Sequence, residues 1–158
     1  MRSICDLLTA EIIAKMNSLV DPEIIKLLYL ASESGVKISL IVRGICCLYP
    51  QRKNLSENIK VISIIGHFLE HSRIFWFCNN DDNDVFIGSA DWMKRNLDRR
   101  IEAVTPIEDY ELKSQLYSLL QTYIKDDYFS WVMKEDGSYS KYPLDLAKNR
   151  SQINLIKK

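Results

Sequence analysis

The sequence predicts a single α/β domain in which helices flank a mixed β-sheet, and two observations lead to this prediction. The chain has 158 residues, of which 47% are hydrophobic, and a chain of this length can bury roughly 70% of the surface that its unfolded state exposes. Near its start, an apolar segment, a helix-start signal and a β-branched segment follow one another. This order is typical of two parallel strands joined by a right-handed crossover.

The crossover unit is predicted element by element. Periodicity alone allows either a helix or a strand over residues 11–17, and we choose a strand because it completes the crossover. Asp21 can cap a helix over 22–34 whose first position is proline, and Gly35 supplies its left-handed end. The β-branched run at 36–42 predicts the second strand.

The rest of the chain is predicted as shorter strands, loops and one long C-terminal helix. Strands are expected at 59–65, 71–77, 84–87 and 100–104, with a surface loop at 51–58 and a hairpin loop at 79–83. Apolar residues at helical spacing predict an amphipathic helix over 108–124. After it we expect an irregular tail.

The expected domain boundaries follow from these elements. Residues 11–124 form the domain, residues 1–10 stay unassigned, and residues 125–158 form a tail that packs on or extends it. No apolar run approaches the roughly 20 residues that a transmembrane helix needs. The start of the chain also lacks a signal-peptide pattern, so we expect a cytoplasmic location.

The four cysteines do not have the paired spacing of a zinc site. We expect them to be small buried hydrophobic residues in a reducing compartment.

Positive charge is concentrated in the middle of a chain without net charge. Residues 37–100 carry 10 basic and 7 acidic side chains. Within them, Lys94, Arg95, Arg99 and Arg100 oppose only Asp98. Such a cluster indicates a site for a local anion rather than a surface for long nucleic acid. A solvated face with salt bridges is an equally good interpretation.

Two short motifs in this region offer phosphate chemistry. His71 and Arg73 would point to the same side of a strand, where an imidazole serves as acid, base or ligand and a guanidinium grips two oxygens. Ser89 follows in a stretch of small residues that lets a ligand approach the backbone closely.

Three further polar residues are placed at the ends of predicted parallel strands. Arg43 follows the strand after the crossover, and Lys15 and Asn17 lie near the end of the strand before it. In open α/β sheets ligands bind outside the carboxyl ends of the strands, so all three are candidates for phosphate binding. A loop arginine that satisfies carbonyl groups is the alternative for Arg43.

Five blocks of sequence, taken in order, resemble the C-terminal catalytic region of bacterial polyphosphate kinase. Their most specific motifs are Val-Arg-Gly at 42–44, His-Ser-Arg at 71–73 and Gly-Ser-Ala-Asp at 88–91. The blocks cover residues 14–21, 42–48, 68–74, 88–93 and 95–100.

The resemblance implies a phospholipase D-like fold and the second of two such domains in a longer enzyme. That enzyme moves the terminal phosphate of ATP reversibly onto inorganic polyphosphate through a phosphohistidine, with Mg²⁺. Arg43 and His71 match family positions that contact ATP. The phosphorylated histidine and the Mg²⁺ ligands belong to the preceding domain, so we expect no metal ligand here and do not assign His71 as the phosphoacceptor.

The resemblance also implies partners. The N-terminal, head and first catalytic domains would be missing from this chain, which we expect to be an inactive fragment, and a homo-oligomer is possible. Two alternatives stay open: a phospholipase D-like phosphodiesterase working as a homodimer, and a non-catalytic anion-binding module. The His-x-Arg and Gly-Ser-x-Asp motifs depart from the lysine and asparagine of the phospholipase D pattern, which disfavours the phosphodiesterase.

Overall fold

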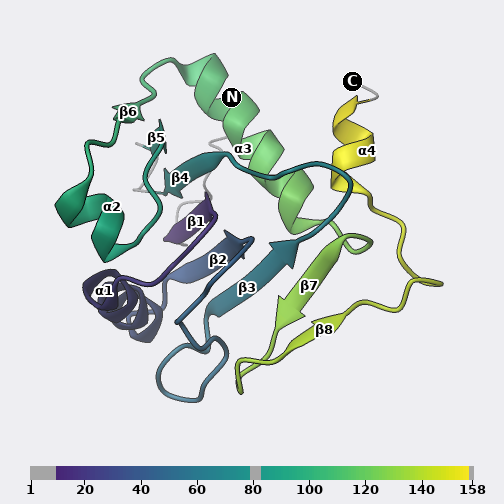
Figure 1. Ribbon diagram of the computed structural model, residues 1–158. Helices are drawn as coiled ribbons and strands as arrows, with labels where there is room; N and C mark the ends of the chain where they lie inside the picture. Colours follow the sequence, from purple (N-terminus) through teal and green to yellow (C-terminus); the bar gives the residue numbers. More distant parts are fainter. Residues whose placement is uncertain (1–9, 79–82, 157–158) are drawn as a thin grey trace.

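A computed structural model describes residues 10–78 and 83–156 and shows one mixed β-sheet of eight strands (Figure 1). Its strand order is β6-β5-β4-β1-β2-β3-β7-β8. The strands are β1 (Glu11–Met16), β2 (Lys37–Val42), β3 (Ile59–Ile64), β4 (Arg73–Phe77), β5 (Asp84–Gly88), β6 (Val104–Pro106), β7 (Ser130–Met133) and β8 (Tyr139–Lys141). The first three strands are parallel, and the strands on either side of them run antiparallel.

Two helices cover the sheet on opposite faces, and two short helices lie at its ends. The helices are α1 (Pro22–Glu33), α2 (Lys94–Arg99), α3 (Tyr110–Ile124) and α4 (Ser151–Ile156). Leu28 of α1 belongs to one core and Leu120 of α3 to the other. None of the helices in the described residues is long and apolar enough to cross a membrane.

The strand chosen for residues 11–17 is confirmed, and its side chains point alternately into the two cores. Ala14 and Met16 lie in the core beside α1, whereas Ile13 lies in the core beside α3. Successive side chains of a strand point to opposite faces, so Lys15 shares the α3 face with Ile13. Lys15 is therefore a buried cation inside an apolar layer, with 1% of its surface exposed.

The predicted crossover helix is also confirmed, together with its signals. Asp21 Oδ1 accepts hydrogen bonds from the main-chain N–H groups of Glu23 and Ile24, both at 3.0 Å. Gly35, just past the helix, has a φ of 91°, a left-handed conformation that favours glycine.

The predicted strand at 100–104 is wrong except at its last residue. Residues 100–103 are not in a strand, and β6 begins at Val104. The N–H group of Ala103 donates to Ser89 Oγ, at 3.0 Å, instead of to a neighbouring strand. The strand predicted at 71–77 likewise begins two residues later, so His71 lies in the connection before β4. Of the hairpin loop predicted at 79–83, residues 79–82 lie outside the described residues.

Residues after 124 contribute strands to the sheet and side chains to both cores, Met133 to the core beside α1 and Phe129 to the core beside α3. Strand β7 pairs with β3, with Val132 opposite Ile62. No strand was predicted here because the apolar residues form too short a run to show a period. The cysteine prediction is wrong for Cys47, which is exposed, while Cys46 is half-buried.

Candidate functional site

The candidate site lies where β1 and β2 end, at their carboxyl edge. Asn17 comes directly after β1 and Arg43 directly after β2. Because the two strands are parallel neighbours, these residues meet, and Arg43 Nε donates to Asn17 Oδ1 at 3.0 Å. The sequence argument placed both residues at this edge, and the structure joins them.

Asp91 is the centre of the hydrogen bonds at this edge. Its Oδ1 accepts from the main-chain N–H of Asn17 at 2.7 Å and from Arg73 Nε at 3.2 Å. Its Oδ2 accepts from Arg73 Nη2 at 3.0 Å. This two-point ion pair is largely buried, with the side chains of Arg73 and Asp91 only 11% and 9% exposed. It fixes the plane of the Arg73 guanidinium.

Arg73 in turn holds His71 at the surface. Arg73 Nη1 lies 2.7 Å from His71 Nδ1 and also donates to the main-chain oxygen of His71 at 3.0 Å. A guanidinium can only donate, so Nδ1 must be the acceptor, and the neutral imidazole carries its hydrogen on Nε2. The exposed ring therefore presents an N–H donor at Nε2.

Lys15 lies behind this surface and not on it. Its Nζ forms an ion pair with Glu70 Oε2 at 3.3 Å and donates to the main-chain oxygen of Ser72 at 3.4 Å. Burial lowers the pKa of Lys15, the Glu70 carboxylate opposes this shift, and the positive charges of Arg43 and Arg73 lower the pKa further. The edge thus holds three cationic side chains, Lys15, Arg43 and Arg73, against the two carboxylates of Glu70 and Asp91.

Ser89, a predicted phosphate ligand, has its hydroxyl occupied. Ser89 Oγ donates to Glu102 Oε2, and Asn96 Nδ2 donates to Glu102 Oε1. These hydrogen bonds lower the pKa of Glu102, and the bond from Ser89 has the larger effect. An open depression of about 500 Å³ beside them is lined by Ser72, Arg73, Ile74, Ile87, Gly88, Ser89, Ala103, Thr105 and Leu116. Its one charged lining residue is Arg73.

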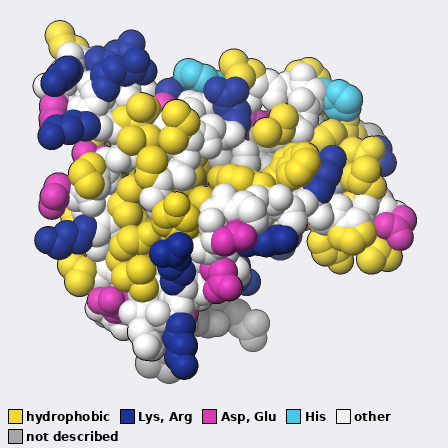
Figure 2. All heavy atoms as spheres, turned by 60° about the horizontal axis from the view of Figure 1, so that its bottom comes forward, with side chains coloured by type: hydrophobic (Ala, Val, Ile, Leu, Met, Phe, Trp, Pro, Cys, Tyr) yellow, Lys and Arg dark blue, Asp and Glu magenta, His cyan; other side chains and the backbone are white. Residues whose placement is uncertain are grey.

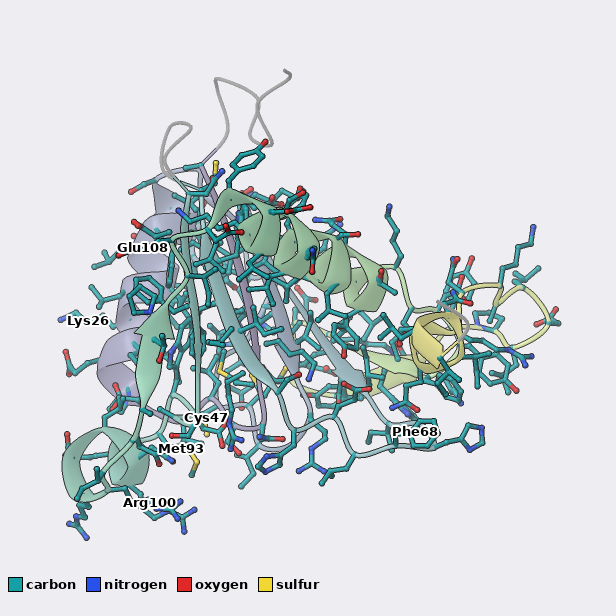
Figure 3. All side chains as sticks on the ribbon, turned by 90° about the horizontal axis from the view of Figure 1, so that it is seen from above. Lys26, Cys47, Phe68, Met93, Arg100 and Glu108 are labelled. Carbon is teal, nitrogen blue, oxygen red and sulfur yellow. The ribbon has the colours of Figure 1, made fainter. Side chains whose placement is uncertain are left out.

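The predicted basic cluster lies on and just after α2 and is exposed. Arg95 and Arg99 form no salt bridge with any described residue, and Arg100 lies 3.9 Å from Glu102. Lys and Arg side chains gather at one rim of the molecule, at the upper left of Figure 2. In Figure 3, Arg100 lies near Met93 along the same edge as Cys47 and Phe68, whereas Lys26 and Glu108 lie away from it.

Arg43 opens onto a second depression, of about 390 Å³. The lining residues are Arg43, Gly44, Ile64, Ile65, Gly66, His67, Phe68 and Leu69. Phe68 and Leu69 are 57% and 68% exposed. Among the described residues, Arg43 has no salt bridge and no other side-chain hydrogen bond than that to Asn17. It is the cation of this edge that keeps donors free.

The structure adds four polar residues that the sequence argument did not select. Asp91 stood in the Gly-Ser-Ala-Asp motif, and Glu70 directly precedes His71, so both had a local signal. Glu102 and Gln152 had none, because their partners Ser89 and Phe68 are 13 and 84 positions away.

The same residues offer no group of metal ligands. Within residues 10–78 and 83–156, no three His, Cys, Asp or Glu side chains are grouped so as to hold a metal ion. The carboxylates of Glu70 and Asp91 are each engaged by a cation, at 3.3 Å and 3.0 Å.

Comparison with solved structures confirms the fold. The polyphosphate kinase from Porphyromonas gingivalis superposes with a TM-score of 0.88 and 39% identity, over 94% of this chain and 23% of that one. NucT from Helicobacter pylori and the phospholipase D family member Nuc from Salmonella typhimurium superpose with TM-scores of 0.56 and 0.53, at 18% and 19% identity. These last two show the fold alone, so the phospholipase D-like prediction is confirmed.

Sequence comparison identifies the family. The polyphosphate kinase of Parasynechococcus marenigrum is 59% identical over 146 residues, which is 91% of this chain and 20% of the relative. That of Prochlorococcus marinus is 64% identical over 126 residues, or 80% of this chain and 18% of the relative. The chain thus spans about a fifth of the length of these relatives. Residues 5–152 match the family model for polyphosphate kinase C-terminal domain 2, and the chain belongs to that family.

Proposed function

We propose that this chain supplies the ATP- and phosphate-binding half of the active site of a polyphosphate kinase. In the intact enzyme the terminal phosphate of ATP moves reversibly to polyphosphate, through a phosphohistidine on a domain that this chain does not contain. The observation that carries the proposal is Arg43, a half-buried guanidinium at the carboxyl edge that is held by a neutral amide and lacks a carboxylate partner among the described residues.

Arg43 is suited to bind a phosphate because of how it is held. Only its Nε donates to Asn17, which leaves the two Nη groups for two oxygens of one phosphate. Asn17 is itself fixed by Asp91. The guanidinium therefore has its orientation set before the ligand arrives, so less conformational entropy is lost on binding.

His71 and Arg73 have different roles in the proposal. Arg73 is neutralised by Asp91 and positions the imidazole through Nδ1. His71 donates from Nε2 to a phosphate oxygen, where charge builds up during transfer. The catalytic contact of this chain is thus assigned to His71, with Arg73 as its positioning residue.

The other predicted ligands contribute less directly. Lys15 and Asn17 support the site from behind, since Lys15 is paired with Glu70 and Asn17 is hydrogen-bonded to Arg43. Ser89 would have to release Glu102 before it could bind phosphate. Arg95, Arg99 and Arg100 would attract a polyanion at longer range, in a manner that salt weakens.

Mg²⁺ is proposed only for the intact enzyme. The described residues of this chain do not fit a metal site, so the ligands would come from another domain. We likewise expect the isolated chain to bind ATP or polyphosphate without turnover, as one part of a larger assembly.

Calorimetric titration of the chain with tripolyphosphate tests the proposal. Arg43→Gln should weaken binding by about tenfold or more, since a hydrogen bond to a charged group contributes roughly 1.5–3 kcal/mol. Lys26→Gln, which removes the same charge from an exposed position of α1, should leave the affinity unchanged. Equal losses in both variants would mean nonspecific attraction and would refute the assignment of Arg43.

Incubation with radiolabelled ATP separates the alternatives. The isolated chain should acquire no label, and adding the remaining domains in trans should restore transfer. Label on the isolated chain would contradict the composite site, and cleavage of a phosphodiester would instead support a phospholipase D-like hydrolase. Binding without any gain on complementation would favour an anion-binding module.

A further inference from the structure

The segment that carries His71 is held by side chains instead of the sheet. Residues 65–72 connect β3 to β4; the N–H of Ile65 donates to the main-chain oxygen of Phe129 at 3.1 Å, and the segment that follows it is residues 66–72. Among the described residues, no main-chain group donates to or accepts from the main chain of this segment. Side chains that hydrogen-bond to it include Lys15, Arg73 and Tyr123, and one residue near the end of the chain, Gln152.

Gln152 makes three hydrogen bonds to this segment. Its Oε1 accepts from the main-chain N–H of Phe68 at 3.1 Å, and its Nε2 donates to the main-chain oxygen of Phe68 at 2.9 Å. Nε2 also donates to Glu70 Oε1 at 2.9 Å. Gln152 is only 3% exposed, so its buried amide depends on these protein partners for its hydrogen bonds.

The helix that carries Gln152 is itself anchored. The N–H and Oγ of Ser151 donate to Asp126 Oδ2 at 2.7 Å and 2.6 Å. Asp126 Oδ1 accepts from the N–H groups of Phe129 and Ser130 at 2.6 Å and 3.0 Å, where β7 begins. Figure 1 shows the connection between β3 and β4 passing beside α4. Gln152 therefore ties this connection to a fixed part of the fold.

Glu70 passes the restraint on to the site. Its Oε1 binds Gln152 and its Oε2 binds Lys15, at 2.9 Å and 3.3 Å, so the residue next to His71 is gripped from two sides. The closeness of the contact is visible at Gly66, where a Cβ atom would lie 2.3 Å from Gln152 Oε1.

We propose that Gln152 is a positioning residue for the phosphate site: by fixing residues 66–70 it keeps Glu70 on Lys15 and the His71 ring on Arg73. The proposal rests on the proposed function for its consequence in ligand binding. Its structural part, the fixed ring of His71, stands apart from that function.

The test combines the tautomer of His71 with tripolyphosphate affinity, in the whole chain at mildly alkaline pH. Nitrogen NMR of the imidazole should show the hydrogen on Nε2 in the unsubstituted chain. Gln152→Met keeps the side-chain length and removes the amide, and should give a mixture of both tautomers. It should also weaken tripolyphosphate binding by about tenfold, because a displacement on the order of 1 Å is costly at such sites.

Asn154→Ala, an exposed position of the same helix, is the matched control and should change neither quantity. A Gln152→Met chain with a lower melting temperature but an unchanged His71 tautomer would overturn the proposal, because the role would then be structural only. Should that variant not fold, Gly66→Ala decides, since its methyl group must push the Gln152 amide away. A shifted tautomer supports the proposal and an unchanged one overturns it.

Failure of the proposed function gives a different result. If the unsubstituted chain does not bind tripolyphosphate, the phosphate site is refuted. The tautomer of His71 in the free protein still decides whether Gln152 positions the ring.

Discussion

The two basic regions of this domain are built in opposite ways. At the carboxyl edge, Arg73 is largely buried and held at two points by Asp91, and Arg43 is oriented by Asn17. On α2, Arg95 and Arg99 are exposed and have no salt bridge among the described residues. The charges on α2 come from one short stretch of sequence, whereas those at the carboxyl edge come from the ends of separate strands, and only the latter have their geometry determined by the fold.

This difference indicates what each region can do. A guanidinium with a fixed direction can select the shape of a phosphate, because little entropy is lost when it binds. Exposed arginines move among many rotamers and act mainly through a field that salt screens. We therefore assign recognition to the carboxyl edge and long-range attraction to α2.

The strongest way to break the comparison is to remove the anchor of the buried region. Asp91→Ala leaves Arg73 buried without a counter-charge and the N–H of Asn17 without its acceptor. Breaking a buried pair by removing one partner costs about 3–5 kcal/mol, so urea denaturation should show a loss of that order in the free energy of unfolding. Asp98→Ala on α2 is the matched control and should cost less than about 0.5 kcal/mol. Similar losses in both variants would show that the two regions do not differ.

The second prediction concerns the exposed region. Replacing both Arg95 and Arg99 by Gln should leave the free energy of unfolding within about 0.5 kcal/mol, as expected for surface positions. It should weaken tripolyphosphate binding at low salt and have no effect at high salt, because only screened charge is removed. Calorimetry at two ionic strengths measures this. A salt-independent loss of affinity would instead mean that these arginines bind the ligand directly.

The smallest expected effect is on the pKa of Glu102, a residue that contacts both Ser89 and, on α2, Asn96. Hydrogen bonds from Ser89 and Asn96 lower the pKa of Glu102 below its ordinary value of 4.5. The pKa of Glu102 is therefore lower in the folded protein than in the unfolded chain. The ionised Glu102 carboxylate stabilises the fold at pH values above its ordinary pKa, and this contribution is lost as the pH falls through the lowered pKa. NMR titration of the Glu102 carboxyl should place its midpoint below 4.5, and Ser89→Ala should move it upward. An unmoved midpoint in that variant would contradict the assigned cause.

Local signals were sufficient for much of the fold. The Asp21 cap, the Gly35 end and the β-branched run before Arg43 each act within a few residues, and each prediction was confirmed. The strand at residues 11–17 could be chosen over a helix only through its neighbours. The 100–104 strand failed because Ala103 binds the Ser89 side chain, a contact that periodicity does not reveal.

The candidate site was predictable as a set of residue types but not as an arrangement. Arg43 and Asn17 were correctly placed at one edge, because parallel strands end together. Lys15 was expected to bind phosphate, yet strand alternation turns it into the α3 core. The ion-pair partner of Lys15 in the structure is the carboxylate of Glu70.

By itself, the sequence determined the crossover unit, the positions of the candidate phosphate-binding residue types and the family likeness, because these depend on neighbours in the chain. Only the tertiary structure decided which charged side chains are paired in salt bridges and which keep free hydrogen-bond donors. Asp91 reaches Asn17 across 74 positions, and Gln152 reaches Glu70 across 82. Such pairings arise from packing around the sheet, and that is why Arg73 is neutralised while Arg43 keeps its donors for a ligand.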